Sequence, residues 1–208
     1  MFKFLVLSLS LLACASTPSL AAGPDAPDAA LKNTVSHLLA NLSQHSPEYR
    51  NDDRAFYQMI DVDVVPRFDV PGIAKFALGR NGRDATPDQR ERFAHALALA
   101  LVHTYARFML NSRGTLDVAW LPVRMEAGAD RAQINSVLMV GTSQRYPVGF
   151  SVRLVDGDWK IYDLQIDGIS MAINYRVQLN EEIKRSSLEA AIERLGKQNI
   201  HLGTASKL

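Results

Sequence analysis

Apolar residues in the first part of the chain recur at helical spacing. An apolar residue every three or four positions is typical of a helix that packs one face against a core. This spacing predicts a first helix with apolar positions Leu31, Val35, Leu38 and Leu42. It also predicts a second helix over residues 53–65, ended by Pro66, and a short third helix that starts at Pro71 and ends near Gly79.

The clearest predicted helix follows Thr86. Thr86 can cap this helix, Pro87 occupies the first helical position, where no amide donor is needed, and Gln89 completes a capping box. We expect the helix to continue to about Asn111. Its broad apolar face consists of Phe93, Ala94, Leu97, Leu101, Val102, Tyr105 and Phe108.

From residue 116 the pattern changes to alternation, which indicates strands. Four strands are predicted, over residues 116–123, 132–141, 146–155 and 158–166. The dipeptide Asp156-Gly157 predicts a type I′ hairpin between the last two. We expect one face of the third strand to carry Val148, Phe150, Val152 and Leu154. In the fourth strand, strict alternation places Trp159, Ile161 and Asp163 on one face and Lys160, Tyr162 and Leu164 on the other.

The chain then returns to a helical pattern. A helix is predicted over residues 171–184 with Ser170 as its cap, followed by a helix over residues 187–195 that Gly196 ends and a flexible tail over residues 197–208. The connections between the strands are too short for crossovers, so the sheet is antiparallel. The expected fold class is therefore α+β, with a curved antiparallel four-stranded sheet wrapped around N- and C-terminal helices.

The N-terminus has the pattern of a secretory signal peptide. Lys3 is followed by an apolar run over residues 4–12 and by the small-x-small site Ser19-Leu20-Ala21. The run is shorter than the about 20 apolar residues that a membrane-spanning helix needs. We therefore expect a signal peptide over residues 1–21 and a mature domain over residues 22–196. A lipoprotein with a lipid on Cys14 is the less favoured alternative.

Composition narrows the possible partners. The net charge of +1 gives no general reason to expect nucleic acid or an anionic membrane surface as a partner. Cys14 is the only cysteine, so the mature chain has no disulfide if cleavage follows Ala21. Its stability must then come from a packed core.

Candidate catalytic chemistry is sparse. The five histidines show no metal-binding spacing, and the sequence around Ser170 lacks the last glycine of a nucleophile elbow. Asp163 and Asp167 leave one enzymatic alternative open, because a small α+β cone can hold an acid–base site of the ketosteroid-isomerase-like class that acts on an apolar substrate. A structural module that only binds a partner protein is a third possibility. The remaining apolar positions can form either a core or an apolar ligand cavity.

Several motifs of the chain resemble those of the MlaC family, also called the toluene-tolerance family. They span about residues 30 to 195 and are Leu78-Gly79-Arg80, Thr86-Pro87-x-Gln89-x-x-x-Phe93, Thr104-Tyr105, Asp158-Trp159-Lys160-Ile161-Tyr162-Asp163, Gly168-Ile169-Ser170 and Asn174-Tyr175-Arg176-x-Gln178. Asn81-Gly82 stands where the family commonly has aromatic residues, so we expect different contacts near the mouth.

The resemblance implies a non-enzymatic periplasmic carrier of glycerophospholipid. Such a carrier is expected to act as a monomer, without a cofactor other than the bound lipid. Its implied partners are an outer-membrane lipoprotein complex and an inner-membrane ABC transporter complex with an MCE-domain subunit, and the implied role is to maintain the lipid asymmetry of the outer membrane. The family's cone-like fold encloses the acyl chains and leaves the head group at the mouth.

Under this resemblance, candidate pocket residues are the apolar side chains on elements expected to face one another. They are Phe76, Phe93, Leu97, Leu101, Tyr105, Val148, Phe150, Val152, Ile161, Ile169, Met171 and Tyr175. Arg80 and Arg176 are candidates to meet a lipid phosphate at the mouth. Asp163 and Asn174 are expected to be structural and to connect the end of a strand to the start of a helix. Lipid species, the number of acyl chains, transport direction and docking surfaces have no signal in the sequence.

Overall fold

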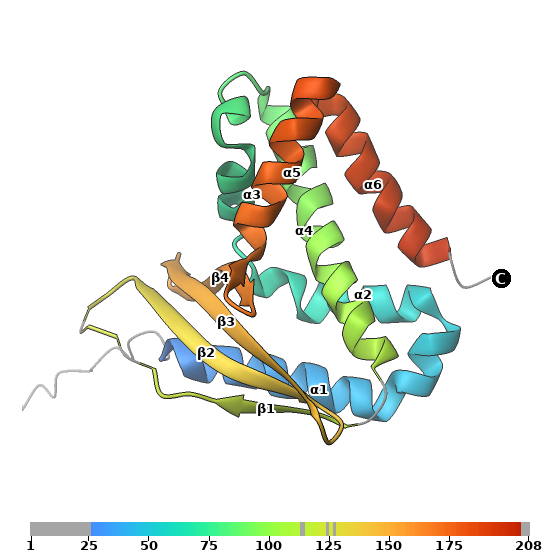
Figure 1. Ribbon diagram of the computed structural model, residues 1–208, viewed down its shortest axis with the longest axis vertical. Coiled ribbons are helices and arrows are strands. Elements are labelled where there is room, and N and C mark those ends of the chain that lie inside the picture. Colours follow the sequence, from blue (N-terminus) through green and yellow to red (C-terminus); the bar gives the residue numbers. More distant parts are fainter. Residues whose placement is uncertain (1–25, 113–114, 124, 127, 205–208) are drawn as a thin grey trace, which may run out of the picture.

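The computed structural model describes residues 26–112, 115–123, 125–126 and 128–204 (Figure 1). Within these residues the chain forms an α+β fold with one antiparallel sheet and a set of helices, as the sequence predicts. The predicted signal peptide over residues 1–21 and Cys14 lie outside the described residues.

The helices follow the predicted order. They are α1 Pro27–Asn51, α2 Asp53–Asp63, α3 Val70–Leu78, α4 Pro87–Asn111, α5 Met171–Arg185 and α6 Leu188–Thr204, with short 3₁₀ turns η1 Val65–Arg67 and η2 Gly79–Gly82. α2 ends just before Pro66, which lies inside η1. A proline cannot donate to the preceding turn and its ring clashes with that turn, so the α-helical pattern stops before it.

The capping box of α4 is present. The Thr86 hydroxyl accepts from the Gln89 amide at 3.1 Å, and the Gln89 side-chain oxygen accepts from the Thr86 amide at 3.0 Å. By length and composition α4 is apolar enough to cross a membrane, but more than half of its most apolar window is buried inside the protein. Phe93 and Leu97 are almost fully buried among α3, α5 and α6. This helix is therefore the central core helix of the fold.

The sheet has five strands in the order β1-β2-β3-β4-β5, each antiparallel to its neighbour. Their bounds are β1 Leu116–Trp120, β2 Arg131–Val140, β3 Gln144–Val155, β4 Asp158–Ile166 and β5 Ile169–Ser170. The predicted type I′ hairpin is confirmed, because Asp156 and Gly157 both have positive φ, 52° and 88°. The sequence predicted four strands. β5 was missed because two residues after a turn are too short to show alternation.

A β-bulge changes which side chains of β4 share a face. Val152 pairs with Ile161, but the preceding Ser151 pairs with Asp163, so Tyr162 is the extra residue. Beyond the bulge, Leu164 lies opposite Phe150 and faces the same side of the sheet as Ile161. The predicted strict alternation of β4 is therefore wrong after Ile161, because one inserted residue reverses the orientation of those that follow.

Three buried clusters hold the layers together. One joins α3, α4, α5 and α6, the second joins α1, α2 and α4, and the third lies between α1 and strands β2 to β4. Figure 1 shows α1 running along the sheet while α4 and α5 rise away from it. Phe68, between α2 and α3, packs against all three clusters. The inner face of the sheet thus looks onto a space bounded by α1, α4 and the start of α5.

The C-terminal helix is longer than predicted. α6 continues through Gly196 to Thr204, so the predicted helix end at Gly196 is wrong, and the predicted tail is helical as far as residue 204. Glycine inside a helix costs only about 1 kcal/mol relative to alanine, which packing can offset. Ala191 and Leu195 supply that packing, because both are fully buried against the helices around α4.

Candidate functional site

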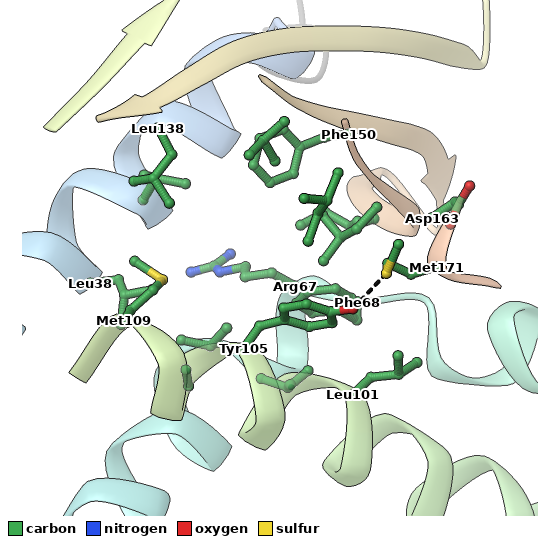
Figure 2. Close-up of a pocket in the computed structure, with 18 of the residues that line it drawn as sticks. Leu38, Arg67, Phe68, Leu101, Tyr105, Met109, Leu138, Phe150, Asp163 and Met171 are labelled. Atoms are coloured by element: carbon green, nitrogen blue, oxygen red, sulfur yellow. Dashed lines mark hydrogen bonds between the residues drawn. The ribbon is translucent and has the colours of Figure 1, made fainter. Parts of the chain in front are cut away.

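A cavity of about 490 Å³ lies between the inner face of the sheet and helices α1, α2, α4 and α5 (Figure 2). Ligand pockets typically have volumes of about 300–1,000 Å³. Most of the lining is apolar. Its aliphatic and aromatic members include Leu31, Val35, Leu38, Ile60, Val64, Phe68, Ile73, Leu101, Val102, Phe108, Met109, Val118, Leu138, Val148, Phe150, Ile161, Leu164, Ile166 and Met171.

The sheet contributes to this wall in cross-strand rows. Val118, Leu138 and Tyr146 form one row across β1, β2 and β3, and all three line the cavity. The next rows inward contain Val148 opposite Ile166, and Phe150 opposite Leu164. Because side chains alternate along a strand, Ser136 and Leu138 of β2 and Tyr146, Val148 and Phe150 of β3 face the cavity. The bulge in β4 adds Leu164 and Ile166 to the same wall.

The serine and threonine hydroxyls in the lining already donate to backbone carbonyls. Thr34 donates to the Ala30 carbonyl at 3.1 Å, and Ser136 donates to the Val148 carbonyl at 3.1 Å. Thr104 donates similarly, to the carbonyl one helical turn before it, at 2.6 Å. With their protons directed into the wall, these hydroxyls present few donors to a ligand, and the cavity is suited to apolar chains.

Tyr105 and Met171 form a contact at one end of the cavity. The Tyr105 hydroxyl donates to the Met171 sulfur (Figure 2). Burial raises the pKa of the Tyr105 hydroxyl above its ordinary value, so this phenol stays neutral. The pair therefore adds no charge to the wall, and the flexible thioether can adapt to a ligand of variable shape.

Among the described residues, the cavity lining holds only three charged side chains, Arg67, Asp163 and Asp167. Asp163 has a structural partner, as predicted: its carboxylate accepts from the Ala172 amide at 3.0 Å, at the start of α5. Asn174 does not connect strand to helix, because its side chain bonds within α5 to Gln178. An acid–base role for Asp163 is disfavoured by this engagement with the helix N-terminus.

Arg67 lies at the end of η1, on the segment that crosses from α2 to α3. Two contacts hold this segment against β4: Lys160 donates to the Pro66 carbonyl at 2.9 Å, and the Asp69 amide donates to the Ile161 carbonyl at 2.8 Å. Figure 2 shows the Arg67 guanidinium extending across the cavity toward Leu38. The fold thus places one cation in a wall that is mostly apolar.

The structure brings six of the predicted pocket residues together around the cavity. They are Leu101, Tyr105, Val148, Phe150, Ile161 and Met171, from α4, three strand positions of β3 and β4, and the start of α5. These residues meet because α4 and the β3–β4 hairpin both turn their apolar faces toward the cavity.

The other six predicted pocket residues lie elsewhere. Phe93 and Leu97 are core residues between α4 and its neighbouring helices, and Val152 is buried in the cluster beneath the sheet. Tyr175 packs against the helical core. Phe76 and Ile169 face outward, with 42% and 59% of their surface exposed. Apolar periodicity identifies a buried face but does not distinguish core from cavity. It also does not reveal that single apolar residues such as Phe76 and Ile169 are exposed.

The two predicted head-group arginines also lie outside the cavity lining. The Arg176 guanidinium stacks over the Phe76 ring, 5.2 Å from its centroid. It also lies against Gly79, where the Cβ of any other residue would come within 3.3 Å of the guanidinium. Arg80 is exposed. Neither arginine belongs to the lining, because the end of α3 and the middle of α5 meet away from the sheet.

Several lining residues were not predicted. Leu31, Val35 and Leu38 were recognised as one face of a helix, but no signal showed that this face looks onto a cavity. Arg67 was missed as well. It lies next to Pro66 in a short turn, where periodicity carries no information about side-chain direction.

Comparisons with known proteins agree with this architecture. A sequence model described as MlaC protein matches residues 32–197. The toluene tolerance protein ttg2D of Pseudomonas putida is 26% identical over 180 residues, which is 85% of this chain and 81% of that protein. A solved structure of a phospholipid-binding protein from Ralstonia solanacearum, in complex with a phospholipid, superposes with a TM-score of 0.74 and 27% identity, and covers 84% of this chain and 97% of that one. With most of its length matched by the family's model, this chain belongs to the MlaC family.

Proposed function

We propose that this protein is a periplasmic carrier that holds a glycerophospholipid by its acyl chains in the cavity between α1, α4, α5 and the sheet. The observation that carries this proposal is an apolar cavity of about 490 Å³ in a chain similar to a phospholipid-binding protein solved with a phospholipid. The proposed ligand-binding residues from the sequence are those that line the cavity, namely Leu101, Tyr105, Val148, Phe150, Ile161 and Met171.

The energetics of such a carrier follow from the cavity wall. An acyl chain with about 16 carbons gains roughly 0.8 kcal/mol for each methylene that leaves water. A bilayer offers the same gain, so the protein must provide nearly equivalent apolar contact for transfer to be reversible. Aliphatic and methionine side chains provide this contact without selecting one chain length.

We propose that the carrier exchanges lipid with two membrane complexes, an outer-membrane lipoprotein complex and an inner-membrane ABC transporter with an MCE-domain subunit. This exchange would maintain the lipid asymmetry of the outer membrane. Family membership supports the proposal. The predicted N-terminal signal peptide supports a periplasmic location. The carrier needs no catalytic step, because the lipid leaves unchanged.

Native mass spectrometry of protein purified from a bacterial periplasm without detergent tests the proposal. The expected result is a folded protein with bound phospholipid, identified by solvent extraction and lipid analysis, with mixed acyl chains and no chemical change after incubation. A folded, lipid-free protein that also takes up no phospholipid from vesicles would overturn it. Release of lysolipid, free fatty acid or another product would favour an enzyme instead.

A further inference from the structure

Arg67 is the one cation in the cavity lining among the described residues. Within the part of the chain that the structure describes, its guanidinium has no hydrogen bond or ion pair. Its side chain is exposed, so water can solvate the charge while the cavity is empty. Acyl chains would displace that water. A desolvated guanidinium without an anion is costly, so a ligand that fills the cavity should bring its own negative charge.

The backbone that carries Arg67 is held in place on both sides. Lys160 binds the Pro66 carbonyl, and the Asp69 amide binds β4 at Ile161. Asp69 is buried and also forms an ion pair with Arg153 of β3. Phe68, the next residue, packs against all three buried clusters. The guanidinium is therefore presented from a fixed position, which reduces the entropy lost when it binds a ligand.

The charges of the lining also give the cavity a direction. Asp163 and Asp167 lie near the start of α5, and Figure 2 shows the Arg67 guanidinium directed toward Leu38 and away from Asp163. An anion is repelled at the aspartate end and attracted at the arginine end. A guanidinium matches a phosphate in geometry, because its parallel N–H groups can donate to two oxygens at once.

We propose that Arg67 binds the phosphate oxyanion of the lipid, so that the cavity selects phosphate-bearing diacyl lipids over neutral diacyl lipids with the same tails. This inference rests on the proposed lipid-carrier function and adds the group that recognises the ligand. The apolar wall supplies affinity for the tails, and Arg67 supplies discrimination by head-group charge.

Exchange against mixed vesicles tests the proposal. Purified protein is incubated with excess vesicles that contain dioleoyl phosphatidylglycerol and dioleoylglycerol in equal amounts, reisolated, and its bound lipids are quantified by mass spectrometry. The wild-type protein should take up mainly the phospholipid. Arg67→Gln should lower the ratio of bound phospholipid to diacylglycerol at least about tenfold, since it removes hydrogen bonds between charged groups. Arg67→Lys, which retains the charge, should restore part of the preference.

The matched control is Arg80→Gln, because Arg80 is also an exposed arginine but lies outside the cavity lining. This variant should keep the wild-type ratio. A wild-type ratio in Arg67→Gln, or an equal fall in Arg80→Gln, would overturn the assignment of Arg67 while leaving the carrier function intact. A wild-type protein that takes up neither lipid would overturn the carrier function, and this inference with it.

A second arm distinguishes lipid phosphate from free phosphate. The exchange is repeated with an excess of inorganic phosphate in the buffer. The wild-type ratio should stay unchanged, because the tails hold the lipid phosphate beside Arg67 at a high effective concentration. A fall of the ratio to the Arg67→Gln value would show that the site takes free phosphate, which would contradict its assignment to the lipid head group.

Discussion

A carboxylate placed on the cavity wall should abolish lipid binding while the fold survives. Leu138 is suited to this test, because it lies in the row between Val118 and Tyr146 and is only partly buried. In the lipid-free protein, Leu138→Glu leaves its carboxylate in contact with water. We therefore expect a loss of unfolding free energy of no more than about 1–2 kcal/mol, the value for a partly buried leucine.

Lipid binding should respond much more strongly. Acyl chains would cover the new carboxylate, and taking a carboxylate out of water has an effective cost of several kcal/mol. A cost of about 3 kcal/mol corresponds to more than about 100-fold in affinity. Far-UV circular dichroism would check folding, and uptake of phospholipid from vesicles would measure binding.

The control variant changes the adjacent residue on the opposite face. Met139 pairs with Asp117 and Arg145, both exposed, so Met139→Glu carries the same charge change on the outer face of the sheet. It should bind lipid as the wild type does. If Leu138→Glu is folded and retains wild-type uptake, the acyl chains do not occupy this cavity.

Three further predictions concern stability and ionisation. Thr86→Ala removes one half of the capping box of α4 and should lower the unfolding free energy by about 1 kcal/mol. In thermal unfolding this corresponds to a melting temperature lower by roughly 2–4 °C. An unchanged melting temperature would contradict a stabilising cap. Arg107→Met leaves the buried Asp53 carboxylate without its ion-pair partner and should lower the unfolding free energy, measured with denaturant, by about 3 kcal/mol. The second change Asp53→Asn removes the unpaired charge and should restore most of this loss. Burial raises the pKa of Tyr57 and of Tyr105 above the ordinary value near 10. Their contribution to stability is therefore complete below pH 10 and falls as pH rises further, because the phenols ionise first in the unfolded protein. Absorbance titration should show that both ionise at higher pH in the folded protein than in the unfolded protein.

Local signals predicted the elements well because each depends on a few neighbouring residues. The capping box at Thr86 determines where α4 starts, and Pro66 stops α2, whatever the rest of the chain does. The Asp156-Gly157 turn requires positive φ at both positions, which identifies the hairpin from two residues. These signals failed where packing overrode them, as at Gly196, which α6 crosses because Ala191, Ile192 and Leu195 of the same helix are buried in the core that contains α4.

The candidate site could be predicted only in part. The apolar faces of α4 and β3 follow from periodicity, which correctly included Leu101 and Phe150 in the wall. The same periodicity placed Phe93 with them, although it lies in solid core. An apolar face has the same sequence pattern whether a side chain or empty space lies opposite, so periodicity alone could not separate the two.

The sequence by itself determined the order of helices and strands, the antiparallel hairpin and the family to which the chain belongs. Only the tertiary structure decided where the cavity lies and which charge enters it. The bulge at Tyr162 turned Leu164 toward the wall, and Lys160 fixed the segment that carries Arg67, although the two positions of that contact, Lys160 and Pro66, are 94 residues apart. Contacts between residues so distant in sequence depend on how whole elements pack, and no short window of residues contains that information.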